Sequence, residues 1–304
     1  MATDALLVTS SLSKRYHGVS TFALEDLTLH VAAGEAYGFL GPNGAGKTTA
    51  IRTLLGFLQP TAGMATICDL DIVKDTVQVK SHVGYMSGDV ALYQKMTGGE
   101  LLKHLQSLQP LKHTEYFAKL VQDFDVDLNK TIAELSKGNK QKIGLLQALM
   151  HEPEVLILDE PTSGLDPLMQ EVFYEHVNLC KKRGAALFLS SHNLNEVQHM
   201  CDRVGIIRSG KLVKELAVSE LDNVGAQRFV ITFADAAPKE LAKLPGVILI
   251  NLDNHQAIVQ VAKDLRPLLS YLSTKHVTHL TNDMASLEDE FLQFYENDTA
   301  EATV

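Results

Sequence analysis

The chain has 304 residues, with 27 Lys and Arg against 37 Asp and Glu, so its formal net charge is −10 at pH 7. This length allows one large domain and one small one, with a sizeable core. The acidic balance argues against general nucleic-acid binding, which needs a basic surface, and we predict no nucleic-acid partner. Cys68, Cys180 and Cys201 lie far apart and form no CxxC pair. This favours a reduced, intracellular protein with neither a zinc site nor a disulfide framework.

The N-terminal sequence "MATDALLVTSSLSKRYHG" has no basic region leading into a long apolar one, so it does not read as a secretory signal. No apolar run approaches the roughly 20 residues that a membrane-spanning helix needs. If the protein works at a membrane, we expect a partner to supply the membrane part.

The strongest motif starts with a short strand-like run, residues 36–40, and ends with an amphipathic segment, residues 49–58. Between them, "GPNGAGKT" fits G-x-x-x-x-G-K-[ST] at every fixed position. In such a loop the backbone N–H groups point at a phosphate, the lysine reaches the outer phosphates, and the threonine hydroxyl can hold Mg²⁺. The alternative is a Gly-rich structural turn. We predict nucleotide contacts along the loop and at the next residue: Gly41, Pro42, Asn43, Gly44, Ala45, Gly46, Lys47, Thr48 and Thr49.

Two further runs, "PEVLILDEPTSGLD" and "ALFLSSHNLNEV", read as buried strands that end in polar residues. Asp159 suits Mg²⁺ held through water, together with Thr48, and Glu160 suits activation of the attacking water. His192 suits a sensor of the γ-phosphate. The alternatives are an ordinary strand end for the two carboxylates and a structural role for the histidine.

The stretch "ELSKGNKQKIGLLQALM" predicts a helix that has Ser136 as its N-cap. Its first turn carries Lys137, Lys140 and Lys142, although cations at a helix N-terminus are unfavourable by about 0.3–1 kcal/mol each. Either an anion binds at this end, or the site is solvated and the penalty is tolerated.

In this order, the motifs resemble those of the ATPase subunit of an ATP-binding cassette (ABC) transporter, over about residues 5–220. The resemblance implies an α/β P-loop NTPase fold for residues 1–222, with a RecA-like mixed sheet, an antiparallel β subdomain and a helical subdomain at about 90–150. It implies that MgATP is the ligand and that Glu160 and His192 are catalytic. The remaining implied ATP contacts are Tyr16, which would stack on adenine unless it is a plain surface tyrosine, Ser136 and Gly138 of the signature, and Asp166 of the D-loop (residues 163–166).

Two departures from the family pattern stand out. The signature has Lys137 in place of its first glycine and Asn139 in place of glutamine. Where the family carries the Q-loop glutamine, this chain has Gly88 and Asp89, and Asp89 could contact Mg²⁺ or water.

The segment of about residues 90–135 reads as helices that, in the family, receive short helices of an integral-membrane permease. The alternative is an ordinary helical insertion. The resemblance therefore implies two partners, the permease and a second ATPase subunit, and a peripheral location on the cytoplasmic face of the cell membrane.

Residues 223–304 read as strand, helix, strand, strand, helix, strand, which is the order of a ferredoxin-like unit. Pro238 fits the first turn of the first helix, "DNH" fits a hairpin turn, and Asp264 fits a cap of the second helix. Ser286 is expected to cap a closing helix in "SLEDEFLQFY", and residues 298–304 to form a frayed tail. For His255, His276 and His279 we expect surface or packing roles.

This extension resembles the C-terminal domain of ATPases from ABC-2 type exporters of drugs and antibiotics, and a role in dimerisation or regulation is a hypothesis. The leading functional prediction is an ATPase that drives export by a separate permease. The alternatives are a soluble cassette protein acting on ribosomes or DNA, and a regulatory module that binds ATP without useful hydrolysis.

Overall fold

The structure is a computed structural model that describes residues 4–221, 227–261 and 264–282. The chain divides into two compact units, Met1–Val218 and Ser219–Val304, and each is described by itself. In the described part of the chain, no helix is both long enough and apolar enough to cross a membrane.

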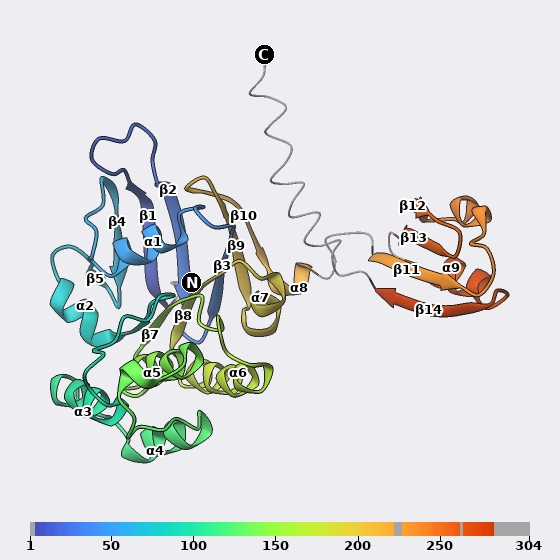
Figure 1. The fold of residues 1–304 in the computed structure, drawn as a ribbon. Coiled ribbons are helices and arrows are strands. Elements are labelled where there is room, and N and C mark those ends of the chain that lie inside the picture. Colours follow the sequence, from blue (N-terminus) through green and yellow to red (C-terminus); the bar gives the residue numbers. More distant parts are fainter. Residues whose placement is uncertain (1–3, 222–226, 262–263, 283–304) are drawn as a thin grey trace. The chain divides into compact units, whose positions relative to one another are not determined.

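The larger unit is built on a six-stranded sheet in which only the edge strand β10 runs antiparallel to its neighbour (Figure 1). Every residue of the three strands β3, β8 and β7 is buried, as expected for parallel strands covered on both faces. In sheet order the strands are β10 (Lys211–Ala217), β9 (Arg203–Arg208), β3 (Ala36–Leu40), β8 (Ala186–Ser191), β7 (Val155–Asp159) and β6 (Val83–Met86).

Because β3, β8, β7 and β6 are parallel neighbours, their carboxyl ends meet along one edge of the sheet. The phosphate loop follows β3, Glu160 follows β7, and His192 follows β8. The sheet order alone therefore gathers the motifs that lie up to about 150 residues apart in sequence.

A second, antiparallel sheet packs on the first through helix α1 (Lys47–Leu54). Leu7, Ile51 and Phe188 belong to one buried cluster, which joins this sheet, α1 and β8. The strands, in sheet order, are β2 (Leu24–Ala32), β1 (Ala5–Lys14), β4 (Ala62–Ile67) and β5 (Leu70–Asp71). The mixed sheet and the antiparallel subdomain expected from the sequence are both confirmed.

The helix after the phosphate loop is shorter than the amphipathic segment 49–58 and begins earlier. It starts at Lys47, because Gly46 caps it, and it ends before Gly56, whose φ of 69° is the left-handed conformation typical of a glycine just past a helix end.

The helical subdomain contains α3 (Gly98–Leu108), α4 (Thr114–Asp123), a 3₁₀ turn (Ile132–Glu134) and α5 (Lys137–Leu149), shown in green at the lower left of Figure 1. A capping box between Thr97 and Glu100 fixes the start of α3. The remaining helices are α2 (Thr76–His82), α6 (Pro167–Lys182), α7 (Leu194–Met200) and α8 (Val218–Leu221).

The smaller unit is a four-stranded antiparallel sheet with its own buried cluster, which includes Phe229, Leu241 and Leu268. In sheet order its strands are β12 (Val247–Leu252), β13 (Gln256–Val261), β11 (Gln227–Phe233) and β14 (Val277–Asn282). The predicted order of elements is confirmed, including the hairpin at residues 253–255. Residues 286–295 and the tail 298–304 lie outside the described residues.

Both helix starts in this unit differ in detail from the expectation. The first helix is only a 3₁₀ turn, Lys239–Lys243, with Pro238 just before it as the N-cap, and Pro245 leaves no room for a longer helix. The second is α9 (Arg266–Leu272), whose N-cap is Leu265. Asp264 nevertheless accepts a hydrogen bond from the Arg266 N–H at 3.0 Å, so its carboxylate does serve the helix start.

Candidate functional site

The phosphate loop connects the end of β3 to the start of α1. Gly46, the N-cap of α1, has a φ of 110°, and a Cβ there would lie 2.5 Å from the carbonyl oxygen of Ala23. Only glycine fits this backbone without a shift, so the motif's fixed glycine has a steric cause.

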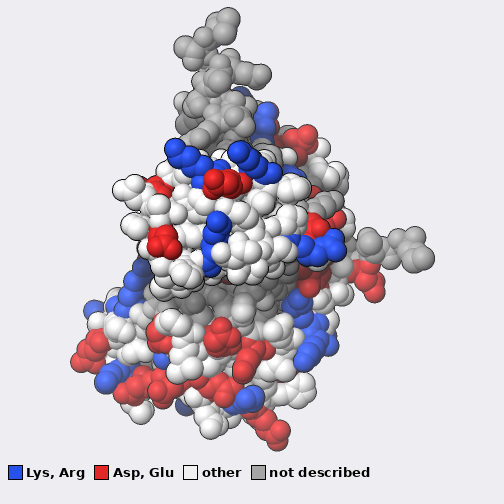
Figure 2. Space-filling view, turned by 90° about the vertical axis from the view of Figure 1, so that its right-hand side faces the viewer, with Lys and Arg blue, Asp and Glu red and all other residues white. Residues whose placement is uncertain are grey.

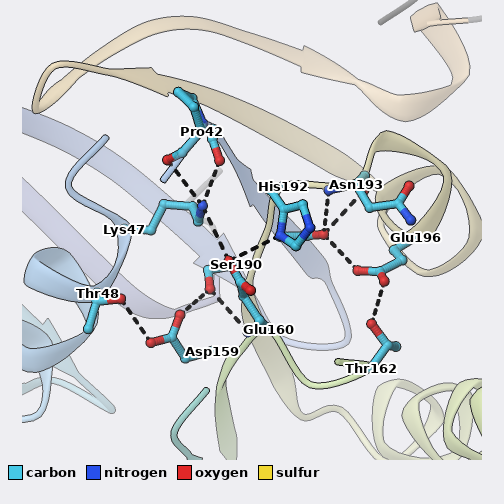
Figure 3. A network of polar contacts seen from close by, with 12 residues as sticks. Pro42, Lys47, Thr48, Asp159, Glu160, Thr162, Ser190, His192, Asn193 and Glu196 are labelled. Carbon is cyan, nitrogen blue, oxygen red and sulfur yellow. Dashed lines mark hydrogen bonds and ion pairs between the residues drawn. The ribbon is translucent and has the colours of Figure 1, made fainter. Parts of the chain in front are cut away.

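Lys47 directs a buried charge into this loop. Its side chain is 5% exposed, and Nζ donates to the carbonyl oxygens of Gly41 at 2.6 Å and Pro42 at 3.3 Å. Nζ also lies 3.5 Å from Glu160 Oε1 (Figure 3). The ammonium group is therefore surrounded by oxygen atoms, which phosphate oxygens can replace.

Three oxygen-bearing side chains meet next to the lysine, as Figure 3 shows. Thr48 Oγ1 donates to Asp159 Oδ2 at 3.0 Å, and Ser190 Oγ donates to Asp159 Oδ1. Mg²⁺ prefers one or two carboxylate or hydroxyl oxygens together with water and substrate phosphates. Thr48 and Asp159 fit this cation by the chemistry of their donor atoms.

Glu160 is held in an unusual backbone conformation directly after β7. Its φ is 48°, which costs a non-glycine residue on the order of 1–2 kcal/mol. Its N–H donates to Ser190 O at 3.1 Å and Ser190 Oγ at 3.2 Å, so β8 holds it in place. The Oε1 atom lies 3.2 Å from His192 Nδ1. The structure thus brings together Lys47, Glu160 and His192, as the sequence predicts.

Tyr16 lies on the exposed side of the phosphate loop. Its hydroxyl is 3.3 Å from Thr49 Oγ1, and its ring is half-exposed. This position, beside the start of α1, is compatible with a stacking surface for a nucleotide base, and that role stays a prediction.

The predicted signature residues lie at the exposed N-terminus of α5. Ser136 caps this helix, because its Oγ accepts from the Asn139 N–H at 3.3 Å. Gly138 packs on the D-loop: a Cβ there would lie 2.9 Å from Gly164 O. Among the described contacts, no hydrogen bond or ion pair joins Ser136 or Gly138 to the phosphate loop of the same chain.

Two predicted site residues occupy less central positions. Asp166 caps α6, since its Oδ1 accepts from the Met169 N–H at 3.0 Å. Gly88 packs against Asp159, and a Cβ on Gly88 would lie 3.2 Å from Asp159 O, but Asp89 itself is exposed. The nucleotide role of Asp166 and the metal role of Asp89 stay predictions.

Sequence reasoning missed two residues that support this site. Gln141 is 2% exposed, and its amide donates to Pro161 O at 3.2 Å and Glu160 O at 3.4 Å. Glu196 accepts hydrogen bonds from Ser191 and Thr162. For Gln141 the only available signal was a polar residue on the inner face of a predicted helix, which is weak, and Glu196 lies in a segment for which no helix was predicted.

In the smaller unit, two of the three histidines named from the sequence contact Asp235. His255 Nδ1 lies 3.0 Å from the Asp235 carbonyl oxygen, and His276 Nδ1 lies 3.5 Å from Asp235 Oδ2. Over all described residues, the search for three or more His, Cys, Asp or Glu side chains able to hold a metal found no group.

Comparisons with known proteins agree with this geometry. The family model described as "ABC transporter" matches residues 24–163. The ABC transporter ATP-binding protein NatA of Bacillus subtilis is 35% identical over 208 residues, 66% of this chain and 83% of that protein. The bacitracin transport ATP-binding protein BcrA of Bacillus licheniformis is 35% identical over 221 residues, 72% of each chain.

A solved structure, of the ATP-binding subunit of an ABC transporter, shares the fold. It is 31% identical in sequence, with a TM-score of 0.67, and the match covers 71% of this chain and 91% of that one. The cassette fold expected from the sequence is therefore confirmed.

Proposed function

This chain belongs to the family of ABC transporter ATP-binding proteins and is an ATPase, and from this premise we propose that it hydrolyses MgATP to drive export through a separate integral-membrane permease. The observation that supports the catalytic part of this proposal is that a lysine and a histidine both lie close to one carboxylate oxygen of Glu160. Glu160 Oε1 lies 3.5 Å from Lys47 Nζ and 3.2 Å from His192 Nδ1.

ATP binds with its phosphates against the phosphate loop and the N-terminus of α1, where the helix dipole favours negative charge. Lys47 exchanges its contacts with Gly41 O, Pro42 O and Glu160 for phosphate oxygens. Thr48 and Asp159 would hold Mg²⁺, which would supply positive charge to neutralise the phosphates during transfer. Tyr16 supports the base beside Thr49.

Glu160 acts as the general base. Once Lys47 and His192 turn towards phosphate, its carboxylate is free to accept a hydrogen bond from the attacking water and then the proton. The exposed imidazole of His192 is placed to contact the γ-phosphate on the open side. Because the Glu160 backbone is fixed to β8, the base keeps its position during this exchange.

Two subunits complete each other's sites. Ser136 and Gly138 offer the N-terminus of α5, with its free N–H groups, to a phosphate, and this end is exposed. Within one chain these residues have no described contact with the phosphate loop, which supports a nucleotide held by a second subunit. Gly138 also contacts the D-loop, so both segments would meet the partner together.

The name of one relative supports the export role. BcrA is named for bacitracin transport. The permease docks on the helical subdomain of α3 and α4, which places this subunit at the cytoplasmic face of the membrane. No nucleic-acid partner is proposed, because the chain carries 37 Asp and Glu against 27 Lys and Arg. Figure 2 shows side chains of both signs on the face that it draws.

The test is Glu160→Gln, which keeps the shape of the side chain but cannot accept the proton. We expect phosphate release to fall by at least about 100-fold, as for loss of a general base. The variant should bind ATP and accumulate as a dimer, measured by light scattering with and without MgATP. The matched control is Glu171→Gln on α6, an exposed carboxylate. Full turnover in Glu160→Gln would reject the catalytic assignment.

The export proposal has its own experiment. Candidate permeases would be co-purified with this chain and placed in vesicles. ATP hydrolysis stimulated by one of them, with MgATP on the side that carries this subunit, is the expected result. A turnover that no permease changes would favour a protein that is not coupled to transport.

A further inference from the structure

One carboxylate, that of Glu196 on α7, bridges two loops of the site (Figure 3). Its Oε2 accepts from Ser191 Oγ at 2.6 Å, and its Oε1 accepts from Thr162 Oγ1. Ser191 and Thr162 are almost fully buried, at 1% and 2% exposed. Hydrogen bonds from buried hydroxyls to a charged acceptor are about twice as strong as neutral ones.

Each end of this bridge belongs to a different part of the machinery. Ser191 directly precedes His192, and its Oγ also accepts from the Asn193 N–H at 2.9 Å. Thr162 lies two residues after Glu160 and directly before the D-loop, residues 163–166. Glu196 therefore joins the loop that carries the histidine to the loop that leaves the general base.

The bridge begins where the sheet stops. Strands β7 and β8 pair up to Asp159 and Ser190, and the last backbone contact is from Glu160 N to Ser190 O. Beyond this point the two segments of the chain separate: the one after β7 leads to α6, and the one after β8 leads to α7. Among the described contacts, the two separated loops stay connected in two ways: through the ion pair of Glu160 with His192, and through the hydrogen bonds that Glu196 accepts.

The opposite side of the same segment is held by α5. Gln141 donates to Glu160 O and Pro161 O, and Gly138 of that helix packs on Gly164 O. The segment from Glu160 to the D-loop is thus fixed from two sides, by an amide from the signature helix and by a carboxylate from α7.

We propose that Glu196 is a positioning residue of the ATPase, which transmits the placement of the D-loop to His192. Pressure of a second subunit on residues 163–166 moves Thr162, and the bridge moves Ser191 and the histidine that follows it. Glu196 acts through the two hydroxyls that it binds. This inference rests on the proposed function, because it requires that Glu160 and His192 carry out hydrolysis.

The experiment compares Glu196→Ala, Glu196→Gln and Thr162→Val by steady-state ATPase kinetics, by ATP binding and by thermal unfolding. We expect kcat to fall about 10-fold or more in Glu196→Ala, since a misplaced loop costs up to roughly 100-fold. The KM for ATP and the melting temperature should change little. Glutamine keeps one acceptor oxygen, so Glu196→Gln should recover part of the rate.

Non-additivity supplies the decisive readout. Thr162→Val removes the same link from its other end, so the double variant Glu196→Ala/Thr162→Val should be no slower than Glu196→Ala alone. The control is again Glu171→Gln, which lies outside the network.

Three results would overturn the proposal: a wild-type kcat in Glu196→Ala, a rate loss that only follows a lower melting temperature and weaker ATP binding, or multiplicative losses in the double variant. Failure of the proposed function is a separate outcome, because it would appear as full turnover in Glu160→Gln. If Glu160→Gln is inactive while Glu196→Ala is normal, only this inference is wrong.

Discussion

Lys47 and Glu160 form an ion pair across the phosphate loop, with Nζ 3.5 Å from Oε1. The lysine side chain is 5% exposed and the glutamate side chain 26%. A buried ammonium group needs compensation, and here one carboxylate and two carbonyl oxygens provide it. The same carboxylate is the proposed general base. When Lys47 exchanges its contact with Glu160 for phosphate oxygens of the nucleotide, the same step therefore frees the base.

The first prediction concerns this exchange. Lys47→Ala should weaken MgATP binding about 10- to 100-fold, because charge-assisted hydrogen bonds contribute about 1.5–3 kcal/mol. Titration with a fluorescent ATP analogue measures the Kd. Lys74→Ala, at a highly exposed position away from the loop, is the control and should bind normally. An unchanged Kd in Lys47→Ala would contradict the assignment.

The second prediction separates the two subunits' contributions. Ser136→Arg places a bulky cation at the exposed start of α5, and it should block hydrolysis while the monomer still binds ATP. The change also removes the helix cap, worth about 1 kcal/mol. Ser136→Ala removes the helix cap without adding a bulky side chain, so it measures the effect of losing the cap alone. If Ser136→Arg abolishes ATP binding by the monomer, the signature serves its own chain's site instead.

The third prediction tests the contact between signature and D-loop. In Gly138→Ala, the new Cβ would lie 2.9 Å from Gly164 O, so backbone must shift. We expect lower kcat and weaker ATP-dependent dimerisation, with ATP binding by the monomer retained. Gly184→Ala, at a glycine where a Cβ would have free space but φ is 90°, controls for general destabilisation. Normal dimerisation in Gly138→Ala would show that this contact is dispensable.

The side chains of the candidate site were predictable because their motifs are local. The phosphate loop is defined by the spacing of Gly41, Gly46, Lys47 and Thr48 within eight residues. Asp159 and His192 each end an apolar run, and a parallel sheet brings such strand ends to one edge. Motif spacing and the ends of the apolar runs, without any distance, were therefore enough to predict that these residues lie together.

The supporting contacts were not predictable from the same patterns. Gln141 lies on a helix that the sequence indicates and Glu196 on a helix for which no prediction was made, and the partners of both lie on other segments. Only the order of the strands brings α5 and α7 to the loop after Glu160. The left-handed backbone of Glu160 is likewise held by hydrogen bonds that its N–H donates to β8, which a local pattern does not reveal.

The fourth prediction concerns pH. His176 is buried between α6 and α4, with Nε2 2.9 Å from Asp123 Oδ2 and its ring stacked on Phe124. Burial lowers the pKa of His176, and the neighbouring Asp123 offsets this only in part. The unfolded chain, with a histidine pKa near 6.5, therefore binds more protons than the folded chain below that pH.

The free energy of unfolding should accordingly have its full value above about pH 6.5 and decrease as the pH falls below this value. One such group contributes at most about 1.4 kcal/mol per pH unit. His176→Gln should make the difference between the urea midpoints at pH 7.5 and pH 5.5 smaller than in the wild type. The difference that remains is due to His151, because burial lowers the pKa of that histidine too. Exposed His199→Gln is the control. Equal pH dependence in His176→Gln and wild type would contradict the prediction.

The last prediction concerns the smaller unit. It has its own four-stranded sheet and buried cluster, and the larger unit ends at Val218. A chain ending at Val218 should therefore fold and bind MgATP with unchanged affinity. If the smaller unit serves dimerisation or regulation, this truncation will change ATP-dependent self-association or turnover. Light scattering in the Glu160→Gln background measures the first, and phosphate release with and without the permease measures the second. Self-association, turnover and transport that all match the full chain would reject both roles, because a unit that is dispensable in each assay neither joins the subunits nor regulates them.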